Sequence, residues 1–451
     1  MARLEEHPTV KALREKIPLA SSRTHPASKI PALDAAWLKQ LCLDAGADDI
    51  GFVEIERPEL AEERRYIEAV FPTTRTLISI VCKMNREPVR RVQRSVANAE
   101  FHHTGHEVNE VARRIVTALE QEGVRAVNPP MAFPMEADHW PQRMWVVSHK
   151  PVAVAAGLGM MGIHRNVIHP KFGNFILLGT VLLEATVSET ARPTEFNPCL
   201  ECKLCVAACP VGAIKPDGAF DLASCYTHNY REFMGGFADW AEHVADAKSG
   251  QDLRKRVTPA EQVSLWQSLA FGPNYKSGYC ISVCPAGEDV IGTYLADRPS
   301  FVKEVVKPLQ QNTEPVYVVP QSDAEGYVQR RFPHKNLRRV RGSLTPSTIP
   351  GFLFGIRISF QRDQAAGLHA IYHFTFTGAQ TAQATVTIFD QAIEVQTGLI
   401  GKADCAVTAD ADTWLGFLRK EKNIIWALLR RKIRVKGKLS LLVAFGKCFP
   451  S

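Results

Sequence analysis

The chain has 451 residues, of which 45% are hydrophobic and 22% charged. This length exceeds what one hydrophobic core normally organises and predicts two or three domains. No apolar run reaches the roughly 18 to 20 residues of a membrane-spanning helix. The net charge of +7 is small for the length. We therefore expect neither a membrane span nor a nucleic-acid partner.

Residues 1–33 are polar and interrupted by prolines, so we expect an arm laid over the body of the protein. The segment has no apolar signal core and no twin-arginine pair, which favours a cytoplasmic location. Four cysteines stand singly in apolar segments, as reduced core thiols do: Cys42, Cys82, Cys405 and Cys448. A disulfide framework is not expected.

Residues 34–190 alternate between helix and strand patterns. Apolar residues recur at helical spacing in 34–46 and 106–122, and the apolar runs 76–82 and 175–183 are typical of buried strands. This alternation predicts an α/β core with a mixed or parallel sheet.

A glycine-rich segment within this core has the spacing G-x-G-x-x-G, at Gly157, Gly159 and Gly162. A dinucleotide-binding fingerprint follows a strand and opens a helix. Here alanine-rich, helix-compatible sequence precedes the glycines and a strand pattern follows them, so nicotinamide binding is the weaker interpretation. The glycines do indicate that the backbone turns sharply or passes close to something bulky.

A run of four cysteines follows the core and is closed by Pro210, with two, two and three residues between the thiols: Cys199, Cys202, Cys205 and Cys209. This spacing is typical of iron–sulfur proteins, in which the fourth cysteine turns toward a second cluster. A zinc knuckle usually pairs two separate two-cysteine turns instead. We therefore predict a two-cluster ferredoxin-like module over residues 191–304.

The ligands of a two-cluster module cross between the cysteine groups. A [4Fe-4S] cluster is thus expected on the first three cysteines of the run and one distant cysteine: Cys199, Cys202, Cys205 and Cys284. The second cluster falls to three cysteines only: Cys209, Cys225 and Cys280.

This second set is one thiolate short, because Ser277 stands where the C-x-x-C-x-x-x-C-P pattern would supply a cysteine. Three alternatives remain open. The cluster contains three irons, or Ser277 or His228 supplies the fourth ligand, or one iron is exposed to water or substrate.

The residue pattern changes in the C-terminal third of the chain. Residues 305–350 combine six prolines with a basic run, which indicates an interdomain linker. Beyond it, 370–377 and 384–389 alternate apolar and polar residues, and helical patterns follow Asp412 and Asn423. We predict a separate α+β domain over 351–451 that lacks a catalytic constellation.

Residues 35–300 resemble the epoxyqueuosine reductase and reductive dehalogenase group of cobalamin-dependent iron–sulfur enzymes. The resemblance rests on Glu100-Phe101-His102, the glycine segment, the step from His169 to Gly173 and the cysteines. It implies an external electron donor such as ferredoxin or flavodoxin. It also implies a cobalamin that is bound without its lower base and receives electrons from the clusters. The residues that the resemblance places in contact with this cobalamin are Phe101, His102, Gly157, Gly159, Gly162, Asn166 and Gly173.

The sequence departs from this group at three positions, one of which is Ser277 at the missing ligand position. The place of the group's acidic proton donor lies near Arg143, and the lysine that follows its glycines is replaced around Ile163-His164. Other residues near the glycine segment are then the candidates for proton donation, although a histidine is more often a satisfied core or surface residue: Glu136, Asp138, His139, His149 and His164. The respiratory dehalogenases carry an export signal that this sequence lacks.

Residues 351–451 resemble the sterol carrier protein type 2 domain, through 402–404, 412–415 and 436–438. The resemblance implies an apolar tunnel that holds lipid-like molecules, while a dimerisation or docking module is the alternative.

The sequence as a whole is compatible with two functions. The first is an iron–sulfur oxidoreductase that reduces a hydrophobic small molecule. The second is a non-catalytic electron-transfer or scaffold protein with a lipid-binding module.

Overall fold

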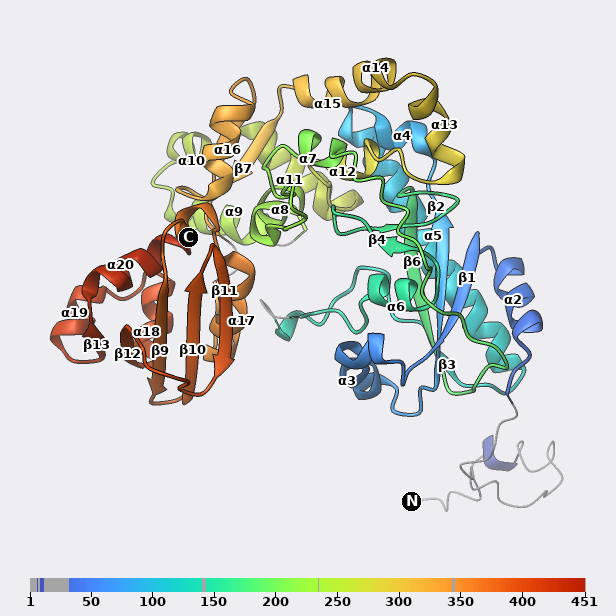
Figure 1. Cartoon of the computed structure of the whole chain (residues 1–451), viewed down its shortest axis with the longest axis horizontal. Coiled ribbons are helices and arrows are strands. Elements are labelled where there is room, and N and C mark those ends of the chain that lie inside the picture. The colour runs from blue at the N-terminus through green and yellow to red at the C-terminus, as the bar shows by residue number, and fades with distance from the viewer. Residues whose placement is uncertain are drawn as a thin grey trace.

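The computed structural model describes residues 6, 9–11, 32–139, 143–233, 235–342 and 345–450, without the side chain of His139 (Figure 1). The predicted N-terminal arm therefore lies almost wholly outside the described residues. In the described ranges, no helix combines the length and the apolar character that crossing a bilayer requires. All eleven cysteines are described, and each is a free thiol.

The N-terminal core is built on a four-stranded sheet in the order β1-β2-β6-β3. Its strands are β1 (Asp49–Glu54), β2 (Thr76–Lys83), β6 (Ile176–Leu183) and β3 (Ala126–Val127). Every pairing is antiparallel, so the predicted mixed or parallel sheet is wrong. Helices cover both faces, and a strand buried on both faces is continuously apolar whichever way it runs.

Two helices pack against β2 and β6 from opposite sides, α5 (Arg94–Gln121) and α6 (His149–Ala155). Helix α5 begins well before the predicted start at residue 106. Its first turns contain polar residues that contact another part of the chain, which hides the helical period. Asn98, for example, accepts a hydrogen bond of 2.8 Å at its Oδ1 from the backbone N–H of Tyr275.

The edge of the core follows the predicted pattern more closely. Helix α2 (Ala35–Asp44) begins after Asp34, whose side chain accepts a hydrogen bond of 2.7 Å from the backbone N–H of Trp37. Asp34 is thus the N-cap that the sequence predicts. Helix α3 (Ala61–Val70) connects β1 to β2 and packs with α6 over one face of the sheet.

The cysteine-rich module is made of short helices. Cysteines lie on or beside α7 (Leu204–Ala208), α8 (Leu222–Asn229) and α12 (Tyr279–Ser282). Three further helices fill the interval between α8 and α12: α9 (Gly235–Asp246), α10 (Gly250–Arg256) and α11 (Pro259–Phe271). After α12 the chain continues through α13 (Glu288–Ala296), α14 (Arg298–Phe301) and α15 (Lys307–Gln311).

The segment predicted as a linker is folded. Strand β7 (Pro315–Val318) pairs in parallel with β8 (Asn336–Arg339), and α16 (Asp323–Arg331) connects them. Val316, Val318 and Val328 join the apolar core of the cysteine-rich module. The linker prediction is therefore wrong for this stretch, because its prolines occupy positions that secondary structure tolerates. Pro315 opens a strand and Pro308 lies in the first turn of α15.

The basic run within this segment is only partly solvated. The side chain of Lys335 is 1% exposed, and its Nζ lies 2.8 Å from Glu314 Oε1 and 2.8 Å from the carbonyl oxygen of Asn312. Glu314 also accepts a hydrogen bond from the hydroxyl of Tyr279, the residue before Cys280. The folded segment thus contacts the element that carries a predicted cluster ligand.

The C-terminal domain contains a five-stranded sheet in the order β11-β10-β9-β12-β13. The strands are β9 (Ala370–Thr377), β10 (Ala382–Phe389), β11 (Ala392–Thr397), β12 (Cys405–Asp410) and β13 (Ile433–Gly437). Only the pairing of β12 with β9 is parallel among these strands. The helices are α17 (Ile349–Ser359), α18 (Ala411–Leu418), α19 (Ile424–Leu429) and α20 (Leu439–Lys447). The predicted α+β domain is confirmed.

Aromatic rings fill the space between this sheet and its helices. The ring of Phe352 on α17 lies 5.5 Å from that of Trp414 on α18, and both contact Phe374 and Phe376 on β9. Asn423 caps α19 as predicted, whereas Asp410, not Asp412, caps α18. The domain touches the cysteine-rich module through an ion pair of 3.0 Å between Arg362 and Asp217.

Candidate functional site

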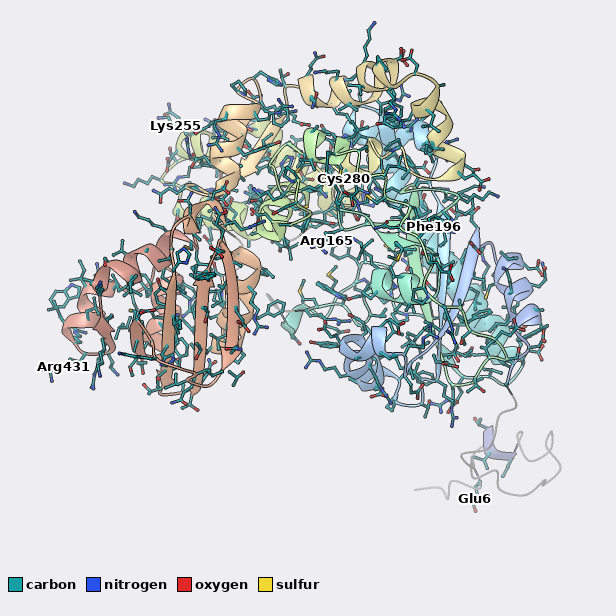
Figure 2. All side chains as sticks on the ribbon, in the orientation of Figure 1. Glu6, Arg165, Phe196, Lys255, Cys280 and Arg431 are labelled. Atoms are coloured by element: carbon teal, nitrogen blue, oxygen red, sulfur yellow. The ribbon has the colours of Figure 1, made fainter. Side chains whose placement is uncertain are left out.

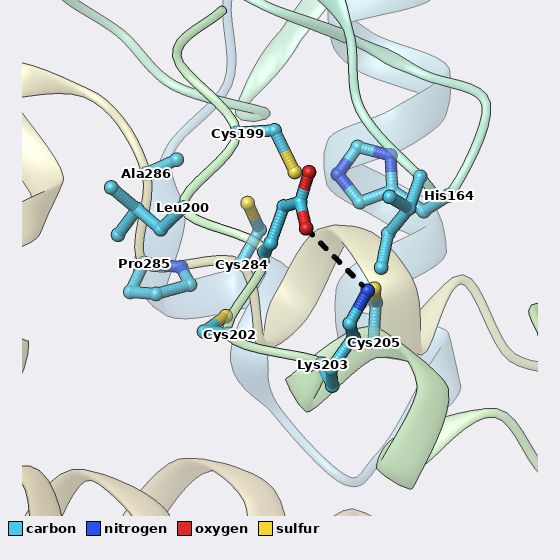
Figure 3. A pocket seen from close by; sticks show the side chains of 11 residues that line it. His164, Cys199, Leu200, Cys202, Lys203, Cys205, Cys284, Pro285 and Ala286 are labelled. Atoms are coloured by element: carbon cyan, nitrogen blue, oxygen red, sulfur yellow. Dashed lines mark ion pairs between the residues drawn. The ribbon is translucent and has the colours of Figure 1, made fainter. Parts of the chain in front are cut away.

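Four cysteines line one small pocket, and they are those predicted for the first cluster: Cys199, Cys202, Cys205 and Cys284 (Figure 3). Cys199 and Cys202 lie in a turn in which Glu201 and Lys203 have positive φ angles of 48° and 60°, and Cys205 lies on α7. This tight turn precedes α7 and directs neighbouring thiols to one side. Cys284 reaches the same pocket from the end of α12, so the structure brings together both halves of the crossed set.

The four thiols of this pocket match the ligand number of an iron–sulfur cluster. In the parts of the chain that the structure describes, no three His, Cys, Asp or Glu side chains are placed to hold one metal ion. An iron–sulfur cluster carries its thiolates on separate iron atoms and needs a wider cage. Burial raises the pKa of Cys284 to about 12, so iron must displace the thiol proton when it binds.

The second set, Cys209, Cys225 and Cys280, comes from α7, α8 and α12. The backbone N–H of Ala213 lies 3.3 Å from Cys209 Sγ, a contact that favours a thiolate. Burial, followed by the charges of Cys209 and Cys280, raises the pKa of Cys225. The three thiols therefore act on one another, as ligands of one cluster would, although their binding of iron stays a prediction.

Both candidates for the fourth ligand make hydrogen bonds to groups outside this set. Ser277 donates its hydroxyl proton to Asn229 Oδ1 over 3.1 Å, and its backbone N–H donates to the same oxygen over 3.0 Å. His228 Nδ1 accepts a hydrogen bond from the backbone N–H of Tyr317 at 3.4 Å. Burial and the ammonium groups of Lys276 and Lys335 lower the pKa of His228 to about 3.

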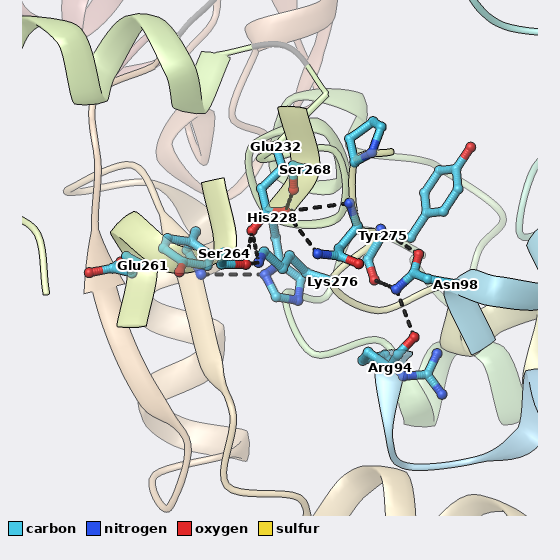
Figure 4. A network of polar contacts seen from close by, with 12 residues as sticks. Arg94, Asn98, His228, Glu232, Glu261, Ser264, Ser268, Tyr275 and Lys276 are labelled. Atoms are coloured by element: carbon cyan, nitrogen blue, oxygen red, sulfur yellow. Dashed lines mark hydrogen bonds and ion pairs between the residues drawn. The ribbon is translucent and has the colours of Figure 1, made fainter. Parts of the chain in front are cut away.

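A buried polar network that the sequence did not reveal holds the segment before Ser277 (Figure 4). Glu232 accepts hydrogen bonds from Ser264 Oγ at 2.5 Å and from Asn274 Nδ2 at 3.1 Å, and it pairs with Lys276. Figure 4 places His228 beside Lys276 within this network. The network anchors α11 and the approach to α12, and thereby orients the cysteines of α12.

The glycines that the resemblance assigns to a corrin face the chain itself. A methyl group at Gly157 would stand 2.6 Å from the carbonyl oxygen of Arg192, and one at Gly162 would stand 2.7 Å from the His164 ring. Gly159 and Gly173 likewise abut the carbonyl oxygens of Ile168 and Ala286. These contacts explain the glycine spacing without a cofactor, and the glycines therefore do not fit a corrin cradle here.

The other residues assigned to the corrin also contact protein. Phe101 packs edge-to-face on Tyr275 with 5.2 Å between ring centroids, and His102 Nε2 lies 2.9 Å from the carbonyl oxygen of Pro273. Asn166 Nδ2 lies 3.7 Å from Cys280 Sγ, which places Asn166 at the second cysteine set. Contact of these residues with cobalamin stays a prediction of the resemblance.

Lys150 is a functional candidate that sequence reasoning missed. Its Nζ donates to Asn166 Oδ1 at 2.9 Å and to the carbonyl oxygen of Arg165 at 2.8 Å. Burial lowers the pKa of Lys150, and the neighbouring Cys280 and Cys225 raise it. The sequence does contain one sign of this role, because Lys150 is a charged residue in the otherwise apolar segment that leads to the glycines.

The predicted proton donors are scattered. Glu136 and Asp138 are exposed, and the side chain of His139 lies outside the described residues. His149 is held between Thr180 Oγ1 at 2.9 Å and the carbonyl oxygen of Pro130 at 3.2 Å, and burial lowers its pKa to about 4. His164 lines the first cysteine pocket, and burial lowers its pKa to about 4 as well.

Arg143, near the place of the relatives' acidic donor, serves a structural role. Its guanidinium pairs with Glu63, with Nη1 3.1 Å from Oε1, and stacks over the Tyr66 ring at 3.9 Å. Both side chains of the ion pair are largely buried. A guanidinium cannot act as a proton donor near neutral pH, so this position offers no replacement for the acid.

Comparison with known proteins supports both resemblances. Residues 358–450 match the SCP-2 sterol transfer family. A relative named epoxyqueuosine reductase, from Gloeobacter violaceus, is 28% identical over 173 residues, which cover 37% of this chain and 49% of the relative. The chain thus spans about half the length of this relative. The predicted resemblances to epoxyqueuosine reductases and to sterol carrier proteins are confirmed.

Solved structures show a weaker likeness. The epoxyqueuosine reductase of Streptococcus thermophilus aligns with a TM-score of 0.34 and 15% identity, over 59% of this chain and 83% of that one. The catabolic reductive dehalogenase NpRdhA aligns with a TM-score of 0.36 and 16% identity, over 60% of this chain and 37% of that one. These scores are too low to equate the folds.

Proposed function

We propose that the chain is an iron–sulfur reductase that passes electrons through two cysteine-held clusters to a hydrophobic small molecule. The observation that carries this proposal is the convergence of Cys199, Cys202, Cys205 and Cys284 on one pocket. The second set shares α7 and α12 with the first, so the two clusters would be neighbours.

The first set is the natural entry for electrons. Leu200, between two of its cysteines, is 43% exposed, so an external donor such as ferredoxin or flavodoxin can approach this turn closely. When bound, the clusters supply one-electron transfer. The protein holds the thiolates, and the network around Glu232 keeps the α12 cysteines in place.

The proposed path ends at the second set and does not pass through a corrin, because the assigned glycines abut the chain itself: three of them meet carbonyl oxygens and Gly162 meets the His164 ring. Lys150 and Asn166 are the polar side chains that reach this end of the path. They would bind and orient whatever group lies beside the second cluster.

A hydrophobic or lipid-like substrate is supported by the C-terminal domain. Besides the match to the sterol transfer family, three apolar residues of α19 are highly exposed: Ile425 at 63%, Trp426 at 61% and Leu429 at 69%. Exposed Arg430 and Arg431 follow them directly. Figure 2 shows Arg431 at the far end of this domain, away from Cys280. Such a surface suits the transfer of apolar molecules.

The test is anaerobic reconstitution of the full chain with iron, sulfide and cobalamin, followed by metal counting. We expect about seven to eight irons per chain, as two clusters require, and reversible reduction of the bound clusters. Fewer than about two irons per chain would contradict the proposal. Stoichiometric cobalt uptake would instead restore the corrin to the path.

The second candidate is a non-catalytic electron-transfer or scaffold protein with a lipid-binding module. The observation that favours it is Arg143, which is locked to Glu63 where the relatives' acid is expected. Reversible cluster reduction without binding of corrin, flavin, nicotinamide or lipid would select this candidate. Lipid-dependent oxidation of the reduced clusters would select the reductase.

A further inference from the structure

We infer that the cluster on Cys209, Cys225 and Cys280 keeps one iron open to a small anionic ligand, and that Lys150 and Asn166 stand at this open position. The inference deepens the proposed function and rests on it, since it requires a cluster at the second set. Its ligand is a single small donor, such as cyanide, that binds iron directly.

The hydrogen bonds of Ser277 exclude it as the fourth ligand. A backbone N–H can only donate, so the Asn229 atom that it meets at 3.0 Å is an oxygen, an acceptor. The Ser277 hydroxyl meets the same oxygen at 3.1 Å and therefore also donates. A serine that binds iron as an alkoxide has lost this proton. Ser277 thus has its hydroxyl committed to Asn229.

The protonation of His228 excludes it in a similar way. Its Nδ1 accepts the backbone N–H of Tyr317, so the single proton of the neutral ring is on Nε2. Nε2 has no hydrogen-bond partner among the described residues, but it offers no lone pair to iron while it carries this proton. The side chain is fully buried and lies beside Lys276, on the side of the Glu232 network.

The polar pair at the second set provides what an anionic ligand needs. Asn166 reaches Cys280 Sγ at 3.7 Å with its amide nitrogen, while its oxygen accepts from Lys150 Nζ at 2.9 Å. Among the described residues, Lys150 forms no ion pair with a carboxylate; its second partner is the neutral carbonyl group of Arg165. Lys150 is half-buried, and the charged groups beside it are the thiols of Cys280 and Cys225. An ammonium group placed there favours an anion at this position.

The test uses cyanide as the probe and EPR spectroscopy of the reduced, reconstituted full chain. We expect ¹³C-cyanide to change the spectrum of the second cluster in the wild-type protein and to add a resolved carbon coupling. Ser277→Cys restores the fourth thiolate and is expected to abolish both effects. Lys150→Met keeps the open iron but weakens cyanide binding by roughly tenfold, because one nearby charge is lost.

Ser282→Cys is the matched control, since it makes the same exchange at the end of α12, five residues after Ser277. The Ser282 hydroxyl donates to the carbonyl oxygen of Val89 at 2.8 Å, a partner outside the cysteine set. This variant should respond to cyanide as the wild type does. A cyanide response that persists in Ser277→Cys would overturn the inference, and so would an unperturbed wild-type spectrum.

Cys225→Ser separates this inference from the proposed function. If Cys225→Ser lowers the iron content but cyanide leaves the wild-type spectrum unchanged, the second cluster exists and only its open iron is refuted. If Cys225→Ser leaves the iron content unchanged, the second cluster is absent and the proposed electron path fails together with the inference.

Discussion

Replacing Arg143 with methionine should destabilise the N-terminal core strongly, because the guanidinium group of Arg143 belongs to a largely buried ion pair. The side chains of Arg143 and Glu63 are 12% and 10% exposed, and Glu63 also accepts the backbone N–H of Ser148 at 3.0 Å. Leaving one partner of a buried pair uncompensated costs about 3–5 kcal/mol. Loss of the stacking over Tyr66 adds about 1 kcal/mol. Hydrogen exchange of the α3 and α6 amides reports the free energy of opening of this core.

The cause of this loss can be separated by a double-mutant cycle. Glu63→Gln and Arg143→Met should each destabilise the core, while the double variant should recover part of the loss, since no charge is then left unpaired. A coupling energy below about 0.5 kcal/mol would refute the reasoning, because independent sites add within that limit. Arg143→Asp should be worse than Arg143→Met, since two carboxylates would then face each other, and it should not create a working acid.

Four further predictions concern other parts of the molecule. Burial lowers the pKa of His149 to about 4 in the folded protein, below its ordinary value near 6.5. Between these two pH values the unfolded chain binds a proton that the folded protein does not, so the free energy of unfolding falls by up to about 3 kcal/mol as the pH drops from 6.5 to 4. His149→Gln should flatten this part of the pH–stability curve measured by urea unfolding. Phe374→Ala should cost the C-terminal domain about 3–5 kcal/mol by opening a cavity among the aromatic rings, visible as a lower melting temperature of that domain in calorimetry. Lys335→Met should destabilise the cysteine-rich module by about 3–5 kcal/mol, and faster proteolysis of 315–339 would reveal it. Cys284→Ser should remove the first cluster and lower the iron content by about half.

The sequence predicted the features that depend on local pattern. Asp34 and Asn423 cap the helices that were expected, and the alternation in 370–377 became strand β9. The crossed grouping of Cys284 with the first cysteines followed from iron–sulfur spacing alone. Each of these rests on a few neighbouring residues or on a fixed motif, which a single sequence displays directly.

The features that failed depend on contacts between distant segments. Continuous apolar strands reveal burial on both faces but not strand direction, so the antiparallel sheet was missed. The N-terminal turns of α5 were missed because Asn98 hydrogen-bonds Tyr275, far away in the sequence. Lys150 looked like an isolated charge until Asn166 and Cys280 were placed beside it. The glycine spacing, in turn, is explained by contacts within the chain, with carbonyl oxygens at Gly157 and Gly159 and with the His164 ring at Gly162.

The folded segment 315–339 determines where this chain can be divided. A shortened protein that ended at residue 304 would remove Val316, Val318 and Val328 from the core that Cys205 and Cys209 share, and would leave apolar surface open to aggregation. The natural place to separate the sterol-carrier-like domain is therefore between β8 and α17, after the parallel strand pair is complete. The cysteine-rich part of the chain therefore extends to β8, and the junction between the two parts is shorter than the prolines suggest.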